Sequence, residues 1–188
     1  DEPAPGPETK TLTRAAFVAT VSDYFDWVHS SEYHDPYKST QQTFVDVRLG
    51  VTTYAKQIET ALEEAIISNA QGYFYPEQSM TREDAADIYV KAFKIPLSAT
   101  NALAGFTDAG TISADRRSSV NAMVAAGYMG GSSATLFAPK DVVTAGDAKA
   151  ILDRITSQLV APPQVMCKSG TTAPRRYVRI STPTPGAK

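Results

Sequence analysis

The sequence predicts a mainly α-helical fold, and three observations carry this prediction. Three segments each begin with a threonine and continue with apolar residues at helical spacing. A pair of short motifs occurs twice in the same order, which indicates a repeated unit. Alternating apolar and polar residues, which are typical of strands, are confined to the C-terminal end. We therefore expect a helical bundle followed by a short β segment.

Each threonine-led segment has the pattern of a helix with one buried face. The segments begin at Thr13, Thr81 and Thr144, and their apolar residues recur at intervals of three and four. Threonine is a favourable N-cap, and two segments place an aspartate, Asp84 or Asp147, where it completes a capping box. Three matching apolar faces predict a central three-helix bundle. The residues predicted to meet in its core are Phe17, Val21, Ile88, Ala92, Ile151 and Ile155.

Two motifs define the repeat. The stretches TFVDV at 43–47 and GFTDA at 105–109 share Phe-x-Asp and lie roughly 62 residues apart. Downstream, FYPEQSMTREDA at 74–85 and FAPKDVVTAGDA at 137–148 share Phe-x-Pro, a hydrophobe and Thr. Between the two motifs lie a shorter helical stretch and a glycine-containing loop, so each unit is helix, loop, helix. The shorter helices are predicted at 54–66 and 116–128.

The two ends of the chain differ from its middle. Residues 1–10 have three prolines in the first seven positions and predict an extended leader. A proline-containing break at 159–165 precedes an alternating stretch that predicts a single strand. We therefore expect a helical domain cut from a longer protein. Its predicted parts are the leader 1–10, the domain 11–160 with units at about 11–40, 41–98 and 103–160, and a linker and strand at 161–188.

Composition argues against several classes of function. The 188 residues carry a net charge of −2 and no block of Lys or Arg, so we expect no nucleic-acid partner. No apolar run approaches the roughly 20 residues of a membrane-spanning helix, so we expect no membrane insertion. The lone Cys167 has no nucleophile motif around it. We predict neither catalysis nor a cofactor for this segment.

One short stretch, HSSEYHDPY, gathers residues that bind metals in other proteins. It contains His29, Glu32, His34 and Asp35. Their spacing matches no strong ligand pattern, and Pro36 favours a surface loop. We therefore predict no metal site.

Taken in order, the motifs resemble the S-layer homology (SLH) family. In that family a repeat opens with Phe-x-Asp, carries Trp-Ala on its first helix and enters its second helix at Phe-x-Pro followed by Thr-Arg-Ala-Glu. Tyr54-Ala55 stands where Trp-Ala is expected, and the unit at Thr13 contributes only its second helix. The resemblance implies a three-lobed pseudo-trimer around the bundle, with partial or permuted repeats. The tail at 169–188 resembles the start of a chitobiase C-terminal-like β-sandwich module.

The resemblance also implies a function. Proteins of the family hold cell-wall polysaccharides, often pyruvylated amino sugars, in grooves between lobes, and so fasten secreted proteins to the bacterial surface. We therefore expect an extracellular location at the cell wall or S-layer, within a larger multi-module protein whose signal peptide lies upstream or has been removed. The alternative is a structural or assembly module that contacts other surface proteins or copies of itself.

The helix starts carry the predicted ligand contacts. The amides and partial positive charge of a helix N-terminus favour an anion, and a first-turn arginine adds paired donors suited to a carboxylate. We expect Arg82 to face solvent, so that its loss would barely affect folding. Ala145 replaces this arginine in the third unit, so at most two grooves are expected to bind. The predicted ligand-binding residues are Arg82, Arg14, Thr81, Glu83, Thr13, and Tyr73 and Tyr75 as an apolar wall for a sugar ring.

Overall fold

The structure is a computed structural model that describes residues 7–25, 43–48 and 50–158. Within these residues the chain forms five α-helices and two short 3₁₀ turns, and its β pairing is limited to isolated bridges. The mainly α prediction is confirmed. The elements are η1 (Pro7–Thr9), α1 (Arg14–Tyr24), α2 (Ala55–Glu63), α3 (Arg82–Phe93), η2 (Ala109–Thr111), α4 (Arg117–Ala125) and α5 (Ala145–Gln158).

The three threonine-led helices begin as predicted. In each of them the threonine hydroxyl accepts a hydrogen bond from the backbone N–H three residues later, at 3.1 to 3.3 Å. In α5 the box is complete, because the Asp147 carboxylate also accepts from Thr144 N at 3.2 Å. In α3 the carboxylate of Asp84 accepts from the Thr81 hydroxyl instead and otherwise turns toward two arginines. The capping box at Asp84 is therefore only half formed.

A closed ring of backbone hydrogen bonds joins the segments that precede these helices. Leu12 N donates to Val143 O at 2.9 Å, Val143 N donates to Met80 O at 2.9 Å, and Met80 N donates to Leu12 O at 2.8 Å. Each segment therefore gives one bond and receives one, as in a three-fold arrangement. Met80 and Val143 are buried, so the ring closes the end of the core.

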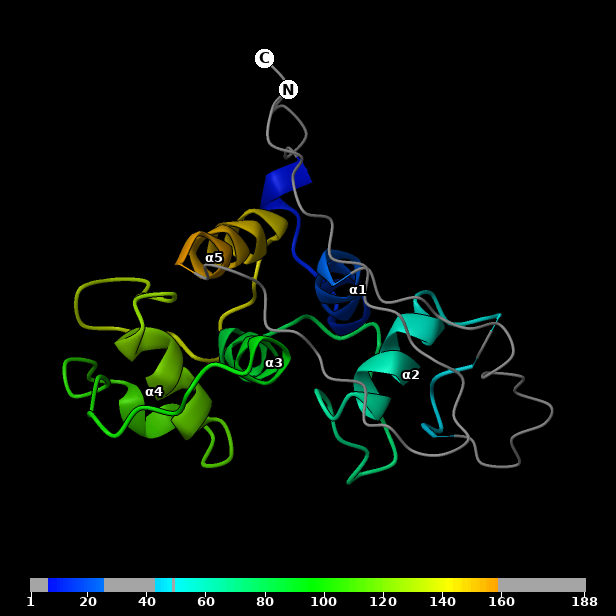
Figure 1. Cartoon of the computed structure of the whole chain (residues 1–188), viewed down its shortest axis with the longest axis horizontal. Coiled ribbons are helices and arrows are strands. Elements are labelled where there is room, and N and C mark those ends of the chain that lie inside the picture. The colour runs from blue at the N-terminus through cyan, green and yellow to red at the C-terminus, as the bar shows by residue number, and fades with distance from the viewer. Residues whose placement is uncertain (1–6, 26–42, 49, 159–188) are drawn as a thin grey trace, which may run out of the picture.

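The core lies among α1, α3 and α5, which occupy the centre of the molecule (Figure 1). The six residues predicted to share a core are all buried and belong to one cluster, so that prediction is confirmed. Tyr89 of α3 links the three helices: its ring meets Phe17 at a centroid distance of 5.1 Å, and its hydroxyl donates to Ala148 O at 2.8 Å. Burial raises the pKa of this phenol.

Two lobes flank the bundle. The first lobe, residues 43–48 and 50–80, carries α2 and packs on α1, whereas the second lobe, residues 105–143, carries α4 and packs on α3 (Figure 1). The described residues do not include a third lobe, so the complete pseudo-trimer stays a prediction. Both lobes have the predicted order of helix, loop and helix entry.

Each lobe is closed by the two motifs that defined the repeat. In the second lobe the carboxylate of Asp108 accepts from Phe137 N at 2.9 Å and from Ala138 N at 2.7 Å. Ala138 has a φ of 56°, a left-handed conformation that points both successive amides at one anion. These bonds, the one from Phe137 N foremost, lower the pKa of Asp108. In the first lobe Asp46 binds the amides of Phe74 and Tyr75 in the same way.

Replacing Asp108 with asparagine is expected to destabilise the fold by about 1–2 kcal/mol at pH 7. Asparagine has one neutral acceptor oxygen in place of the two ionised ones that the two backbone N–H groups use. Asp108 has a lower pKa in the folded chain, so its stabilising effect is present above the ordinary aspartate value near 3.9 and is lost as the pH falls through the folded value. Urea unfolding at pH 7 and pH 3 should therefore show a difference between the two chains that shrinks in acid.

Asp153→Asn is the matched control for Asp108→Asn, since the Asp153 side chain is 61% exposed and, within the described part of the chain, pairs with Lys149 of its own helix alone. Exposed pairs of this kind contribute roughly 0.5 kcal/mol or less. Equal losses of unfolding free energy in the two variants would contradict a stabilising role for the two hydrogen bonds to Asp108.

The N-terminal segment differs from the predicted extended leader. Its described part, Pro7–Thr9, forms a 3₁₀ turn that packs on α5. Ala145 N donates to Lys10 O at 2.9 Å, and a Cβ on Gly146 would lie 3.0 Å from Glu8 O. The packed structure therefore begins before Thr11, because the backbone of this turn covers the start of α5.

Three predictions concern residues outside the described ranges. They are the C-terminal strand, Cys167 and the histidine-containing stretch with His29 and His34. Among the described helices, none combines the length and apolar character needed to cross a bilayer.

Candidate ligand-binding grooves

The first-turn arginines of α1 and α3 each cover the phenylalanine of a neighbouring lobe. The Arg14 guanidinium lies 5.1 Å from the Phe74 ring centroid, and its Nε donates to Phe74 O at 2.9 Å. The Arg82 guanidinium lies 4.8 Å from the Phe137 centroid, and its Nε donates to Phe137 O at 3.0 Å. Both arginines therefore attach a lobe to a helix start, through a cation–π contact and a hydrogen bond.

The prediction that Arg82 faces solvent is wrong. Its Nη2 also donates to Gly130 O at 2.6 Å, so the second lobe receives two hydrogen bonds from one guanidinium. Burial lowers the pKa of Arg82, and the charges of Asp147 and Asp141 act in the opposite direction. Local spacing placed the residue in an exposed first turn, but the ring it covers comes from the next unit of the chain.

This contact explains why the third unit has Ala145. At the start of α5 the neighbouring segment is η1, and the three positions that correspond to Phe-x-Pro read Gly6, Pro7 and Glu8. No phenylalanine stands there for an arginine to cover. The unit that lacks the arginine thus also lacks the phenylalanine, and Gly146 leaves room for the backbone of Glu8.

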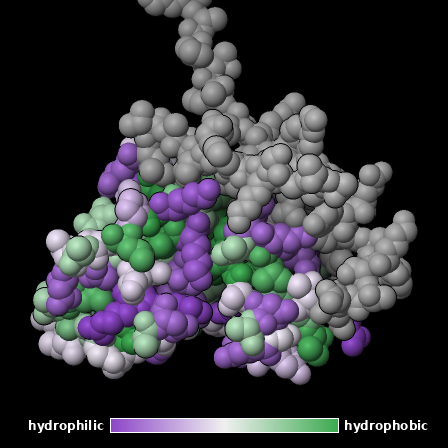
Figure 2. All heavy atoms as spheres, turned by 60° about the horizontal axis from the view of Figure 1, so that its bottom comes forward, coloured by the Kyte–Doolittle hydropathy of each residue, from purple (hydrophilic) through white to green (hydrophobic). Residues whose placement is uncertain are grey.

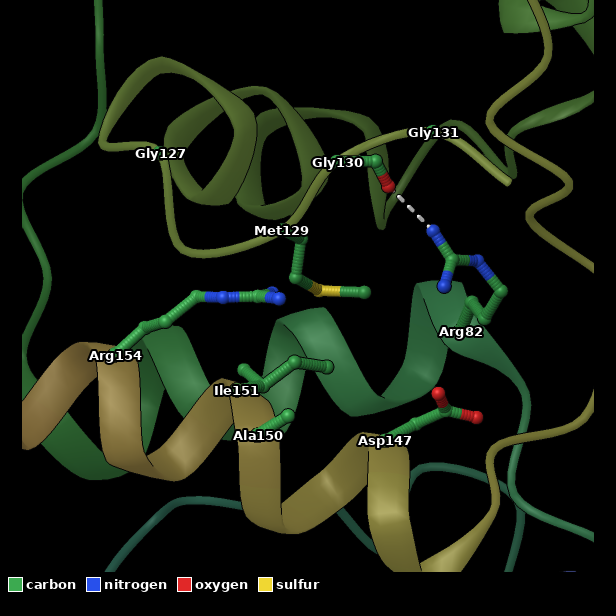
Figure 3. Close-up of a pocket in the computed structure, with 9 residues that line it drawn as sticks. All are labelled: Arg82, Gly127, Met129, Gly130, Gly131, Asp147, Ala150, Ile151 and Arg154. Atoms are coloured by element: carbon green, nitrogen blue, oxygen red, sulfur yellow. Dashed lines mark hydrogen bonds between the residues drawn. The ribbon is translucent and has the colours of Figure 1, made fainter. Parts of the chain in front are cut away.

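The first groove, named here the Arg82 groove, lies between α3, α5 and the loop that follows α4 (Figure 3). Its volume is about 440 Å³. Met129 and Ile151 give it apolar walls, and Gly131 has no space for a side chain because a Cβ would lie 2.3 Å from Ser133 O. The groove is lined by Arg82, Gly127, Met129, Gly130, Gly131, Asp147, Ala150, Ile151 and Arg154.

Two arginines give the Arg82 groove its positive character. The Arg154 side chain reaches in from α5 toward the loop, and its Nη1 donates to Tyr128 O at 3.2 Å (Figure 3). Within the described residues, neither Arg82 nor Arg154 has a carboxylate partner at ion-pair distance. Asp147 also lines the groove, but its carboxylate accepts the N–H and the hydroxyl of Thr144. The groove therefore offers guanidinium N–H donors to an anion.

The second groove, named here the Arg14 groove, is its counterpart one unit earlier in the chain. It lies between the two lobes, where Figure 2 shows a hollow with hydrophobic surface between two bodies of described atoms. Its volume is only about 50 Å³. The groove is lined by Arg14, Ile66, Ile67, Ser68, Asp84, Asp87, Ile88, Lys91 and Arg116.

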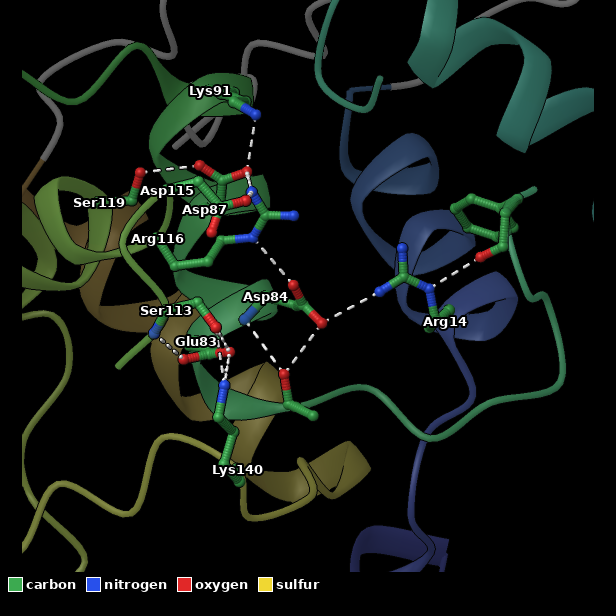
Figure 4. A network of polar contacts seen from close by, with 12 residues as sticks. Arg14, Glu83, Asp84, Asp87, Lys91, Ser113, Asp115, Arg116, Ser119 and Lys140 are labelled. Atoms are coloured by element: carbon green, nitrogen blue, oxygen red, sulfur yellow. Dashed lines mark hydrogen bonds and ion pairs between the residues drawn. The ribbon is translucent and has the colours of Figure 1, made fainter. Parts of the chain in front are cut away.

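The charges of the Arg14 groove are paired with one another (Figure 4). Asp84 lies between two guanidiniums, 3.1 Å from Arg14 Nη1 and 2.9 Å from Arg116 Nε. Asp87 accepts from Lys91 at 2.7 Å and lies 3.4 Å from Arg116 Nη1. Burial alone would raise the pKa of Asp84, but the Arg116 hydrogen bond and the Arg14 charge lower it below its ordinary value. Each charged side chain of this lining therefore has a partner of opposite charge within the groove.

The predicted site residues are divided among different places. Thr13 and Thr81 are the N-caps of α1 and α3. Glu83 is buried and lies outside both groove linings; it accepts from the Ser113 N–H and hydroxyl and contacts Lys140, which ties the second lobe to α3. Its role in the structure is a lobe contact, as Figure 4 shows.

The two tyrosines flank the phenylalanine that Arg14 covers and line neither groove. Tyr73 and Tyr75 are 46% and 43% exposed and stack on one another at 5.6 Å, on either side of Phe74, which Arg14 covers. The corresponding neighbours of Phe137 are leucine and alanine. The predicted apolar wall therefore does not face the Arg82 groove, whose walls are aliphatic.

Arg154 was not among the predicted site residues. It lies in the third turn of α5, whereas the predicted ligand contacts lay at helix starts. The signal that identifies it is the repeat itself, since Arg154 stands at the same distance from Thr144 as Lys91 does from Thr81. A cation is thus present at this position in both units.

Comparison with known proteins agrees with the repeat boundaries. Residues 43–86 and 105–148 each match the S-layer homology domain. The chain is 29% identical over 147 residues to exoglucanase XynX of Acetivibrio thermocellus, an alignment that covers 77% of this chain and 13% of that protein. Each matched segment contains one Phe-x-Asp motif, one Phe-x-Pro motif and the start of one threonine-led helix. The chain therefore contains two repeats of the S-layer homology family, at 43–86 and 105–148.

Proposed function

We propose that this chain is a non-catalytic anchoring module that binds an acidic cell-wall polysaccharide in the Arg82 groove. S-layer homology repeats attach proteins to cell-wall polysaccharide, and two of them are present here. The relative named an exoglucanase is matched over only 13% of its length, so its enzymatic activity is not transferred to this segment. The observation that carries the proposal is a cavity of about 440 Å³ that holds two arginines, neither of which is at ion-pair distance from a carboxylate of the described residues.

The chemistry of the groove favours a sugar that bears a carboxylate. Among the described residues, the Arg154 side chain donates one hydrogen bond, to Tyr128 O, and Arg82 supplies a second positive charge at the same cavity. A planar carboxylate, such as that of a pyruvate ketal, accepts paired N–H donors of a guanidinium. Ala150, an exposed residue of the lining, offers apolar surface to an acetamido methyl group. A pyruvylated amino sugar is therefore the proposed ligand, and the bacterial cell surface is the proposed location.

Replacing Arg154 with alanine is expected to weaken binding to wall sacculi about tenfold or more, because a charge-assisted hydrogen bond contributes roughly 1.5–3 kcal/mol. Folding should change by about 0.5 kcal/mol or less, since the side chain is exposed. The measurement is co-sedimentation of the purified chain with polymer-bearing sacculi, alongside sacculi stripped of polymer, with thermal melts of both chains.

Lys149→Ala is the matched control for Arg154→Ala. The Lys149→Ala substitution removes an equal charge from the same helix, but the Lys149 side chain lies outside the groove lining and pairs with Asp153 at 2.6 Å. It should bind like the wild type. Equal weakening by the two variants would show a general charge effect and contradict recognition in the groove.

A second candidate function is assembly with other surface proteins or with a second copy. The observation that favours it is the gathering of exposed apolar side chains on the first lobe. This candidate would be favoured if the free chain sedimented as a dimer or larger species in a velocity experiment and bound neither type of sacculus. The residues concerned are Val45, Val51, Tyr54, Tyr73 and Tyr75.

A further inference from the structure

The two grooves are built from equivalent positions and differ at a few of them. The equivalence follows from each helix's distance to its threonine cap and from the phenylalanine that each first-turn arginine covers. Both grooves have an aspartate at the third position of one helix and a cation near the end of that helix. The matched pairs are Arg14 and Arg82, Asp84 and Asp147, Asp87 and Ala150, Ile88 and Ile151, and Lys91 and Arg154.

The equivalent aspartates behave differently. Asp147 completes the capping box of α5, where it accepts from Thr144 N at 3.2 Å and from Thr144 Oγ1 at 2.7 Å. Asp84 accepts only the hydroxyl at its own cap and directs both carboxylate oxygens at guanidiniums. Asp147 therefore caps its helix, whereas Asp84 binds two arginines, as Figure 4 shows for Asp84.

The cause of this difference is Arg116, the residue that precedes α4. Its Nε donates to Asp84 at 2.9 Å, and its Nη1 contacts Asp115 and Asp87. No described helix stands beside α5 in the way that α4 stands beside α3. The Arg82 groove therefore has no counterpart of Arg116 among the described residues, and Asp147 stays on its cap.

We propose that Asp84 is an internal ligand of the Arg14 groove: its carboxylate occupies the position between guanidiniums that an acidic ligand would take, so that, of these two grooves, the Arg82 groove is the one open to such a ligand. The inference rests on the proposed function, because it states which of two related grooves binds. The volumes of about 50 and 440 Å³ agree with a filled and an open groove.

The internal carboxylate is well placed to exclude an external one. Arg14 has Nη1 on Asp84 and Nε on Phe74 O, and its side chain is 20% exposed. A second anion at this point would face a carboxylate at close range, and like charges repel strongly in partly buried surroundings. The lowered pKa of Asp84 keeps it ionised at neutral pH.

The test uses inorganic sulfate as an anionic probe and the Nε–H NMR signals of individual arginines as the readout. In the wild type, sulfate should shift the signals of Arg82 and Arg154 and leave that of Arg14 in place. In Asp84→Asn, the Arg14 signal should also shift. The sulfate concentration at half of its shift should lie within about tenfold of the concentration for Arg154, because neither guanidinium is then paired with a carboxylate of the described residues. Arg116 is a weaker reporter, since Asp115 and Asp87 still contact it.

Asp147→Asn is the matched control, because it removes the equivalent charge without freeing Arg14. The inference is overturned if Arg14 responds in the wild type at the same sulfate concentration as Arg154, a measurement that needs no variant to fold. It is also overturned if Arg14 stays silent in a folded Asp84→Asn chain. Silence of Arg82 and Arg154 in the wild type would instead count against the proposed binding groove, so the two failures are distinguishable.

Discussion

Phe137→Ala is expected to lower the free energy of unfolding by about 3–5 kcal/mol, the range for a large aromatic side chain removed from a core. The Phe137 ring is fully buried, contacts Phe106 at a centroid distance of 5.8 Å and lies under the Arg82 guanidinium. Its backbone amide is held by Asp108. The substitution therefore leaves a cavity where the Asp108 hydrogen bonds close the second lobe and where Arg82, at the start of α3, covers it.

The measurement for Phe137→Ala is urea-induced unfolding, followed by helical circular dichroism. Leu136→Ala is the control: its side chain is the adjacent one and is 43% exposed, so a change of about 0.5 kcal/mol or less is expected. A loss below about 1 kcal/mol for Phe137→Ala would show that the lobe does not depend on this ring.

Arg82→Ala is expected to reduce both stability and binding. The free energy of unfolding should fall by about 2–3 kcal/mol, because the second lobe loses two hydrogen bonds from a charged donor and a cation–π contact. Binding to polymer-bearing sacculi should weaken about tenfold or more, since the groove loses one of its two positive charges. Arg82→Lys should recover only part of either loss, because a single ammonium cannot reproduce the paired donors.

Arg14→Ala separates the two roles of the first-turn arginines. Arg14 makes the same type of contact with Phe74, so this variant should also lose stability. It should bind sacculi like the wild type, because the Arg14 guanidinium is already paired with Asp84. Equal binding losses in Arg14→Ala and Arg82→Ala would contradict the assignment of binding to one groove, and wild-type affinity in Arg82→Ala would remove Arg82 from the site.

The elements that depend on nearby residues were predictable from the sequence. Helical periodicity placed α1, α3 and α5, and the threonine caps marked their starts, because a cap and its helix are adjacent in the chain. The repeated motifs indicated two units of the same build. Repetition also explains why six core residues were identified correctly from three separate stretches.

The electrostatics of the site were not predictable, because they depend on partners from other units. Nothing near Arg82 in the chain reveals that it covers Phe137, and nothing near Asp84 reveals that Arg14 and Arg116 converge on it. A first-turn arginine was therefore taken as exposed, although two of its N–H groups bind the second lobe. Only the folded arrangement shows which cations retain unused donors, and it points to Arg154.

The closed ring of backbone bonds among Leu12, Met80 and Val143 has a consequence for the order of folding during synthesis. The first segment emerges from the ribosome long before the last one exists, so Leu12 has to wait for its acceptor, Val143 O. Contacts between such distant parts of a chain form late, because they require closure of a long loop. Until then α1 has α2 and α3 as its folding partners. A nascent chain halted before Val143 should therefore hold its first lobe against α1 while the ring remains open.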